Sequence, residues 1–222
     1  VCACLLTALY FSFFLSYDGH MRKKSHILLA RCLADNFILN NIEDADLQYH
    51  RAAFCMGAIL PDCEPSFLTE KHAYDVNFEK LVKKMRELTT WCNLDERKAG
   101  AYWIKAGEVT HYVADYFTFP HNTNFPGGIA QHCRYEEELK INLKKCILCG
   151  NADGYCKASE NFKDCEEIVA YIRASHEQYM KKSSDVSEDI EYIISTSYQV
   201  LAGLAALLDQ KIKGESPDVR IN

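Results

Sequence analysis

The sequence of 222 residues lacks several motifs that mark common classes of enzyme. It has no Gly-rich phosphate loop and no Gly-x-Ser-x-Gly motif, which excludes the nucleotide-binding and serine-hydrolase chemistry that those motifs carry. It also has no stripe of basic and aromatic residues of the kind that nucleic-acid readers show. Because its net charge is −6, we do not expect charge alone to attract nucleic acid or an anionic membrane.

The sequence also lacks any stretch that alternates strictly enough to predict a β-strand, and it has no internal repeat and no long linker. Its apolar residues instead recur with helical spacing. We predict an all-α fold, a single compact multi-helix domain over residues 21–222. Six of the predicted helices cover residues 24–39, 46–59, 96–118, 129–148, 161–181 and 187–213. A further predicted helix is capped by Thr69 and carries the apolar residues from Phe78 to Leu88.

The first 16 residues are almost entirely apolar but fall short of the roughly 20 that a membrane span needs. They lack the basic leading region and the small-residue cleavage motif of a signal peptide. We therefore predict Met21 as the functional start and residues 1–20 as an apolar leader outside the functional protein. A chain that starts at Met21 is expected to be cytoplasmic, and one that keeps residues 1–20 membrane-anchored or secreted.

Eleven cysteines cannot all pair within one chain. A group of them lies around a loop rich in Gly, Asn and Asp, but its spacing fits no common zinc ribbon or finger. Free thiols, or disulfides in an exported protein, are favoured there over a metal. The role of the group stays open. It comprises Cys146, Cys149, Cys156 and Cys165.

Residues 107–123, GEVTHYVADYFTFPHNT, carry the first of several side chains of metal-ligand type. His111 and Asp115 are four residues apart and share one helix face, and His132 and Glu136 repeat this spacing on the next helix. Each pair alone is typical of a solvated helix face. The ordered set of these residues is not typical of a solvated face. Nitrogen and carboxylate ligands of this kind suit zinc. The remaining candidates are His26, Asp62 after Pro61, His72 and His121.

This order resembles the zinc-dependent phospholipase C family of bacteria, all-α enzymes with three zinc ions. The resemblance covers roughly Met21 to Leu208 and depends most on His111-x-x-x-Asp115, His121 and His132-x-x-x-Glu136. The Leu-Pro-Asp segment at 60–62, with His72, is similar to the upstream ligand pair, as His26 is to the first-helix histidine. The resemblance implies that the chain hydrolyses phospholipids to diacylglycerol and a phosphorylated head group through zinc-activated water, with transient contact to the membrane surface.

By position, the resemblance implies two to three zinc ions. One lies among His72, His111, Asp115 and Asp62; Asp115 bridges to a second, which His26 also binds; His121, His132 and Glu136 hold a third. Asp62 is the implied general base.

The chain departs from the family at two places. The family completes the second site with an N-terminal tryptophan, where this chain has Phe13. The terminal amine of a chain starting at Met21, five residues before His26, is the expected substitute. Cys63 stands where the choline-specific enzymes have an aromatic residue, so no preference for choline is implied.

Two other functions stay open. The zinc-dependent single-strand nucleases share this fold and zinc arrangement, although the acidic charge disfavours a nucleic-acid substrate. A non-catalytic zinc-binding helical protein is the third alternative, because the tryptophan is missing. The sequence does not predict the oligomeric state.

Overall fold

The structure, a computed structural model, describes residues 20–41, 45–63, 73–90, 96–182 and 185–214. These residues form helices, with no strand among them, which confirms the predicted all-α fold. The 3₁₀-helices are η1 (Pro61–Cys63), η3 (Phe119–His121) and η4 (Asn151–Gly154). The α-helices are α2 (His20–Asn40), α3 (Ala45–Gly57), α4 (Tyr74–Thr90), α5 (Glu96–Tyr116), α6 (Ile129–Leu148), α7 (Cys165–Tyr179) and α8 (Val186–Gly214).

Helix α6 begins and ends where the sequence predicts, whereas α5 ends at Tyr116 rather than at residue 118. It stops there because Thr118 is extended, with φ −105° and ψ 114°. The Asn122 side chain donates hydrogen bonds to the carbonyl oxygens of Tyr116, at 3.1 Å, and Thr118, at 3.0 Å. Carbonyls at the helix end are thereby satisfied, and the chain turns directly into η3.

Helix α7 begins at Cys165, later than the predicted residue 161. The Asp164 side chain caps it by accepting a hydrogen bond from the Glu167 backbone N–H at 3.0 Å, as N-cap carboxylates do. Helix α4 begins at Tyr74. Its predicted cap, Thr69, lies outside the described residues.

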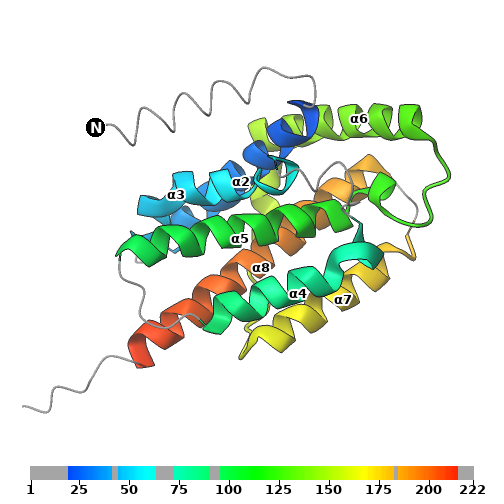
Figure 1. The fold of residues 1–222 in the computed structure, drawn as a ribbon. Coiled ribbons are helices and arrows are strands. Elements are labelled where there is room, and N and C mark those ends of the chain that lie inside the picture. Colours follow the sequence, from blue (N-terminus) through cyan, green and yellow to red (C-terminus); the bar gives the residue numbers. More distant parts are fainter. Residues whose placement is uncertain (1–19, 42–44, 64–72, 91–95, 183–184, 215–222) are drawn as a thin grey trace, which may run out of the picture.

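Helix α5 lies in the middle of the fold. It packs against α2 and α3 on one side and against α4 on the other, and it also contacts α8 (Figure 1). Helix α6 lies at the edge of the fold, where it contacts α2 and α8. Because α5 has neighbours on all these sides, every residue from 109 to 118 is buried. Polar side chains in this segment are therefore held away from bulk water.

The close crossing of α3 and α5 depends on two glycines. A Cβ atom on Gly57 would overlap the carbonyl oxygen of Ile104, and one on Gly107 would overlap that of Phe54. Only glycine lets the two backbones approach so closely. The crossing brings the end of α3 against the turn of α5 that precedes His111.

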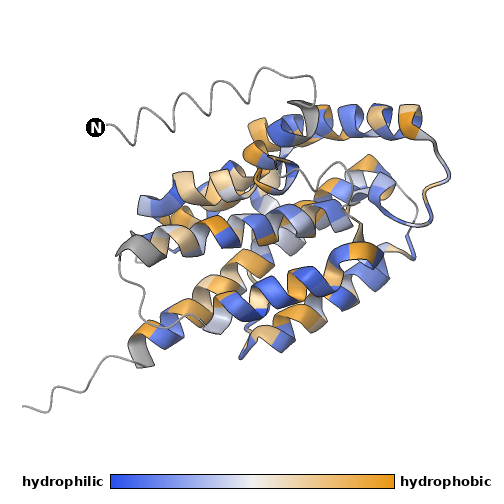
Figure 2. Cartoon of the chain, viewed as in Figure 1, coloured by the Kyte–Doolittle hydropathy of each residue, from blue (hydrophilic) through white to orange (hydrophobic). Residues whose placement is uncertain are grey.

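Helix α8 supplies much of the core, with Ile190, Ile194 and Leu201 among its buried residues. In Figure 2 the visible face of α4 is largely hydrophilic, whereas hydrophobic residues predominate along α8. By length and composition, residues 186–212 are apolar enough to cross a membrane, but 72% of the apolar stretch is buried inside the fold. Burial in the core accounts for this composition.

The cysteines that the sequence groups together do not converge on one point. All of them are free thiols. The Cys156 thiol forms a hydrogen bond with that of Cys32 on α2, whereas Cys165 interacts with Thr89 at the end of α4. Cys149 is exposed just after α6. None of these cysteines belongs to a group of described residues that could hold a metal ion.

Candidate metal centre

The second half of α5 places His111 and Asp115 on one buried face. Their side chains are 0% and 6% exposed, and His111 Nε2 lies 3.2 Å from Asp115 Oδ2. The same nitrogen lies 3.7 Å from Oδ1 of Asp62, which belongs to η1. Two carboxylates thus face one imidazole nitrogen.

A backbone hydrogen bond fixes which nitrogen of His111 faces the carboxylates. Nδ1 lies 2.9 Å from the carbonyl oxygen of Ala58. Since a carbonyl can only accept, Nδ1 carries the hydrogen, and the lone pair of the neutral ring is on Nε2. A lone pair that faces two carboxylates is unfavourable unless a cation lies between them. Ligand histidines of metal sites are oriented by this kind of hydrogen bond.

The charges around His111 favour a cation at Nε2. Burial lowers the pKa of His111, but Asp115 and Asp62 raise it further, to about 9. The negative charge that favours a proton on this nitrogen also favours a metal ion beside it.

His26 reaches the same place from α2. Its ring stacks on that of His111 with centroids 3.9 Å apart, and its Nε2 lies 3.3 Å from Asp115 Oδ1. Burial and the neighbouring His111 lower the pKa of His26, which favours the neutral ring that metals bind. Its Nδ1 is buried and has no hydrogen-bond partner among the described residues. Buried nitrogens are rarely left so unless another group completes the site.

The ligand atoms of His26, His111 and Asp115, the buried cluster, all lie within 4.8 Å of one another. Asp115 is their common partner, and its Oδ1 also lies 3.5 Å from His121 Nδ1. Burial alone would raise the pKa of Asp115, but the three histidines hold it well below its ordinary value. Asp115 is therefore an anionic centre shared by three imidazoles.

A second group, the rim cluster, consists of His121 in η3 with His132 and Glu136 on α6. Its ligand atoms also lie within 4.8 Å of one another. Both imidazole Nε2 atoms face Glu136 Oε1, at 3.1 Å from His121 and 2.8 Å from His132. These side chains are 6–23% exposed. Two nitrogens and a carboxylate in this arrangement form a donor set that suits zinc.

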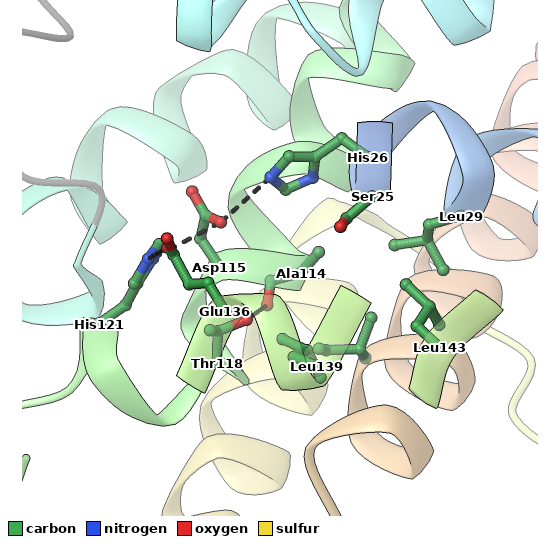
Figure 3. Close-up of a pocket in the computed structure, with 11 residues that line it drawn as sticks. Ser25, His26, Leu29, Ala114, Asp115, Thr118, His121, Glu136, Leu139 and Leu143 are labelled. Atoms are coloured by element: carbon green, nitrogen blue, oxygen red, sulfur yellow. Dashed lines mark hydrogen bonds and ion pairs between the residues drawn. The ribbon is translucent and has the colours of Figure 1, made fainter. Parts of the chain in front are cut away.

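The two clusters meet at a small pocket. His26, Asp115, His121 and Glu136 form its polar end. Figure 3 shows His121 on one side of this pocket and Leu139 and Leu143 on the other. The rest of the lining consists of the hydroxyl-bearing Ser25 and Thr118 and of the apolar residues Leu29, Ala114, Leu139, Leu143 and Ile193. The pocket thus presents metal-type ligands at one end and an apolar wall at the other.

The predicted ligands that the structure describes lie together. His26, His111 and Asp115 form the buried cluster, with Asp62 Oδ1 3.7 Å from His111 Nε2, and His121, His132 and Glu136 form the rim cluster. His72 lies outside the described residues, so its predicted role stays a prediction.

Met21 lies in the first turn of α2. Five residues of helix correspond to about 7.5 Å along the axis, so a terminal amine there reaches the site of His26 only if the first turn unwinds. Ligation by this amine stays a prediction.

His176 fits no ligand spacing in the sequence, which therefore predicts a surface residue, but His176 is buried in the structure. Its ring stacks on Tyr74 with centroids 3.8 Å apart, and its Nε2 lies 2.8 Å from Asn122 Oδ1. The surface prediction is wrong because α7 packs His176 against the turn between α5 and η3. No local spacing in the sequence signals that contact.

Sequence reasoning also misses two groups that orient ligands. One is the carbonyl of Ala58, which holds His111; the other is Asp189, which accepts a hydrogen bond from the backbone N–H of Phe119 in η3. A backbone carbonyl has no signature in a sequence. Acidic residues are favoured in the first turn of any helix, so the sequence does not distinguish Asp189 from an ordinary residue at a helix N-terminus.

An all-α fold that gathers imidazole and carboxylate groups into two adjacent clusters defines a helical protein with two candidate metal sites. Residues 25–186 match the zinc-dependent phospholipase C family, and the chain belongs to this family. Membership supports a function of phospholipase C type, a zinc cofactor and a phospholipid substrate. No curated protein and no solved structure gave a match.

Proposed function

We propose that this protein is a zinc-dependent phosphodiesterase that hydrolyses phospholipids to diacylglycerol and a phosphorylated head group. The observation that carries the proposal is the pair of clusters joined at Asp115, because His26 and His121 face the same carboxylate oxygen at 3.3 and 3.5 Å. Adjacent cation sites fit an anionic phosphodiester. When bound, zinc supplies a Lewis acid that neutralises phosphate charge and makes water acidic enough to act near neutral pH.

We assign the ligands in accordance with this geometry. Asp62, His111 and Asp115, with His72, hold one ion, and His26 and Asp115 hold the next. The rim cluster holds a third. The Ala58 hydrogen bond orients His111, so that Nε2 rather than Nδ1 is presented.

Asp62 is our candidate general base. It lies in η1 directly after Pro61, and its side chain is only 3% exposed. A carboxylate shielded from bulk water can orient an attacking water and take its proton. Asp62 Oδ1 also lies 3.7 Å from His111 Nε2, so Asp62 is close enough to share a metal ion with His111.

The apolar wall of the pocket supports a lipid substrate. Leu29, Leu139 and Leu143 lie on the side of the pocket away from His121. A phosphodiester at the clusters would place its glycerol portion against these leucines, which favours burial of methylene groups. A nuclease site would instead need cations and stacking aromatics along its groove.

The segment before α6 is our candidate for contact with a phospholipid surface. Ile129 is 85% exposed, and the Phe125 ring lies 6.2 Å from the ring of His132. Ile129 precedes the proposed ligand His132 by three residues, and an exposed aliphatic side chain there gains free energy by entering the interface of the bilayer. The surface that we propose to touch the membrane therefore adjoins the proposed substrate site.

Metal analysis paired with two substrates tests the proposed function. Protein spanning residues 21–222 and the full chain are assayed on phosphatidylcholine–phosphatidylethanolamine vesicles and on single-stranded DNA, with and without a chelator. We expect zinc-dependent release of phosphorylated head group from the vesicles. Cleavage of DNA alone would identify a nuclease, and bound zinc without turnover of either substrate would identify a non-catalytic protein.

A further inference from the structure

Asp189, in the first turn of α8, is a fully buried carboxylate whose oxygens meet three hydrogen-bond donors. Oδ2 accepts from the backbone N–H of Phe119 at 2.9 Å and from the Tyr135 hydroxyl at 2.8 Å. Oδ1 accepts from the Tyr179 hydroxyl at 2.8 Å. Its side chain comes from none of the elements that carry the proposed ligands, and the proposed chemistry does not use it.

Two of these donors, the groups of Phe119 and Tyr135, lie next to the rim cluster along the chain. Phe119 begins η3, the three-residue helix that ends at His121, and Tyr135 precedes Glu136 on α6. The two rings also pack together, with centroids 5.8 Å apart. One carboxylate oxygen therefore joins the two separate segments that must meet for the rim cluster to form.

A carboxylate suits this site, because it accepts from all three donors at once. An asparagine could keep its oxygen at the Oδ2 position and donate its N–H to the Tyr179 hydroxyl, which can also accept. An apolar side chain would remove every acceptor. Burial raises the pKa of Asp189 to about 6, although the N–H of Phe119 and the two hydroxyls favour the charged form. Near neutral pH the group is therefore an anion within a satisfied network.

We propose that Asp189 is a positioning residue for the rim cluster: it fixes η3 against α6 so that His121 meets His132 and Glu136 at one metal ion. This inference rests on the proposed zinc function. Hydrogen bonds that orient ligands typically change metal affinity by about 10–100-fold. Asp189 acts on the ligands only through the backbone of Phe119 and through Tyr135. We therefore expect loss of its carboxylate to lower the zinc affinity of the rim cluster about tenfold.

The test measures zinc retention by the zinc-loaded full chain in competition with a chromogenic chelator. His132→Ala first identifies the zinc that belongs to the rim cluster, as the ion that this variant lacks. We then expect Asp189→Leu, which removes every acceptor at about the same size, to release that ion at about tenfold lower chelator concentration, with the other zinc unchanged. Tyr135→Phe removes one donor without changing the packing and is expected to have a smaller effect in the same direction.

Val200→Ala is the matched control for a purely structural effect. Val200 is fully buried on the same helix, so its truncation lowers stability without touching the network. We expect its zinc release and its cobalt(II) spectrum to match those of the wild type, whereas the cobalt(II) spectrum of Asp189→Leu should differ. Rim-cluster zinc held as tightly as in the wild type by folded Asp189→Leu, or by Tyr135→Phe if the first variant does not fold, overturns the inference. A wild-type chain that binds no zinc overturns the proposed function as well.

Discussion

At the scale of the residue, Asp115 is the most connected group of the candidate site. Its two oxygens face His26, His111 and His121, which come from three different elements. A buried carboxylate is stable only when it is paired or coordinated. Any change at Asp115 therefore alters both clusters at once.

Asp115→Asn should remove more zinc than any other single amide substitution and should also lower activity. The amide lacks the charge that offsets the cations, and it turns an N–H group toward an imidazole. We expect activity to fall by more than about 100-fold, beyond the range of changes outside the ligand shell. Elemental analysis and head-group release measure the two effects. The control is Asp75→Asn on the exposed first turn of α4; small, equal effects from both variants would refute the bridging role.

Asp62→Asn separates the roles of base and ligand. If Asp62 serves mainly as the base, the variant keeps much of its zinc while its turnover falls by about 10²–10⁴-fold, the usual contribution of general base catalysis. The measurement is kcat beside the zinc content of the same sample. Zinc and turnover lost in proportion would show that Asp62 acts as a ligand alone.

At the scale of the element, the crossing of α3 and α5 decides whether His111 is oriented. Gly57 and Gly107 let the helices approach, and the Ala58 carbonyl that holds His111 follows directly after Gly57. The end of α3 therefore sets the orientation of His111 on α5 through backbone contacts rather than through side chains.

Gly107→Ala should destabilise the protein even though alanine favours helices by about 1 kcal/mol. The new methyl group would overlap the Phe54 carbonyl oxygen, and separating the helices costs about 1–3 kcal/mol. The readout is the free energy of unfolding in urea. Gly100→Ala on the same helix is the control, because its methyl group would meet only His50 Nδ1 at 3.7 Å; it should be neutral or stabilising. Equal stabilities of the two variants would argue against a glycine-dependent crossing.

The sequence predicts elements better than the contacts between them. Apolar spacing locates the helices because their periodicity is local, and α6 is placed without error. The pairs His111–Asp115 and His132–Glu136 are visible for the same reason. What joins the pairs depends on tertiary packing, which apolar periodicity does not encode. The resemblance to a known family groups the distant ligands, but the contacts of His176 and Asp189 appear only in the structure.

At the scale of the whole molecule, the proposed ions act as cross-links. The candidate ligands lie on α2, η1, α5, η3 and α6, so bound zinc would join elements from residue 26 to residue 136. Such a site exists only in the folded chain, and its binding free energy therefore adds to the free energy of unfolding.

We expect two to three zinc ions per chain and a melting temperature that falls on chelation. At free zinc 100 times the dissociation constant, one site contributes about 2.7 kcal/mol, which corresponds to roughly 5–10 °C for a domain of this size. Calorimetry with and without a chelator measures the shift. Less than one zinc after growth in zinc-replete medium, or identical melting temperatures, would contradict the cross-linking role.

The hydrogen bond from Phe119 to Asp189 also has a consequence for the order of events during synthesis. The ribosome adds the last proposed ligand, Glu136, 53 residues before it adds Asp189. A nascent chain that already exposes every ligand side chain therefore lacks the carboxylate that joins η3 to α6. Ions that such a chain captures meet loose histidines with little geometric preference. If the rim cluster holds a metal as proposed, selection among metals by geometry would begin only when α8 has been made and has docked, and the choice of metal there would be a late step of maturation.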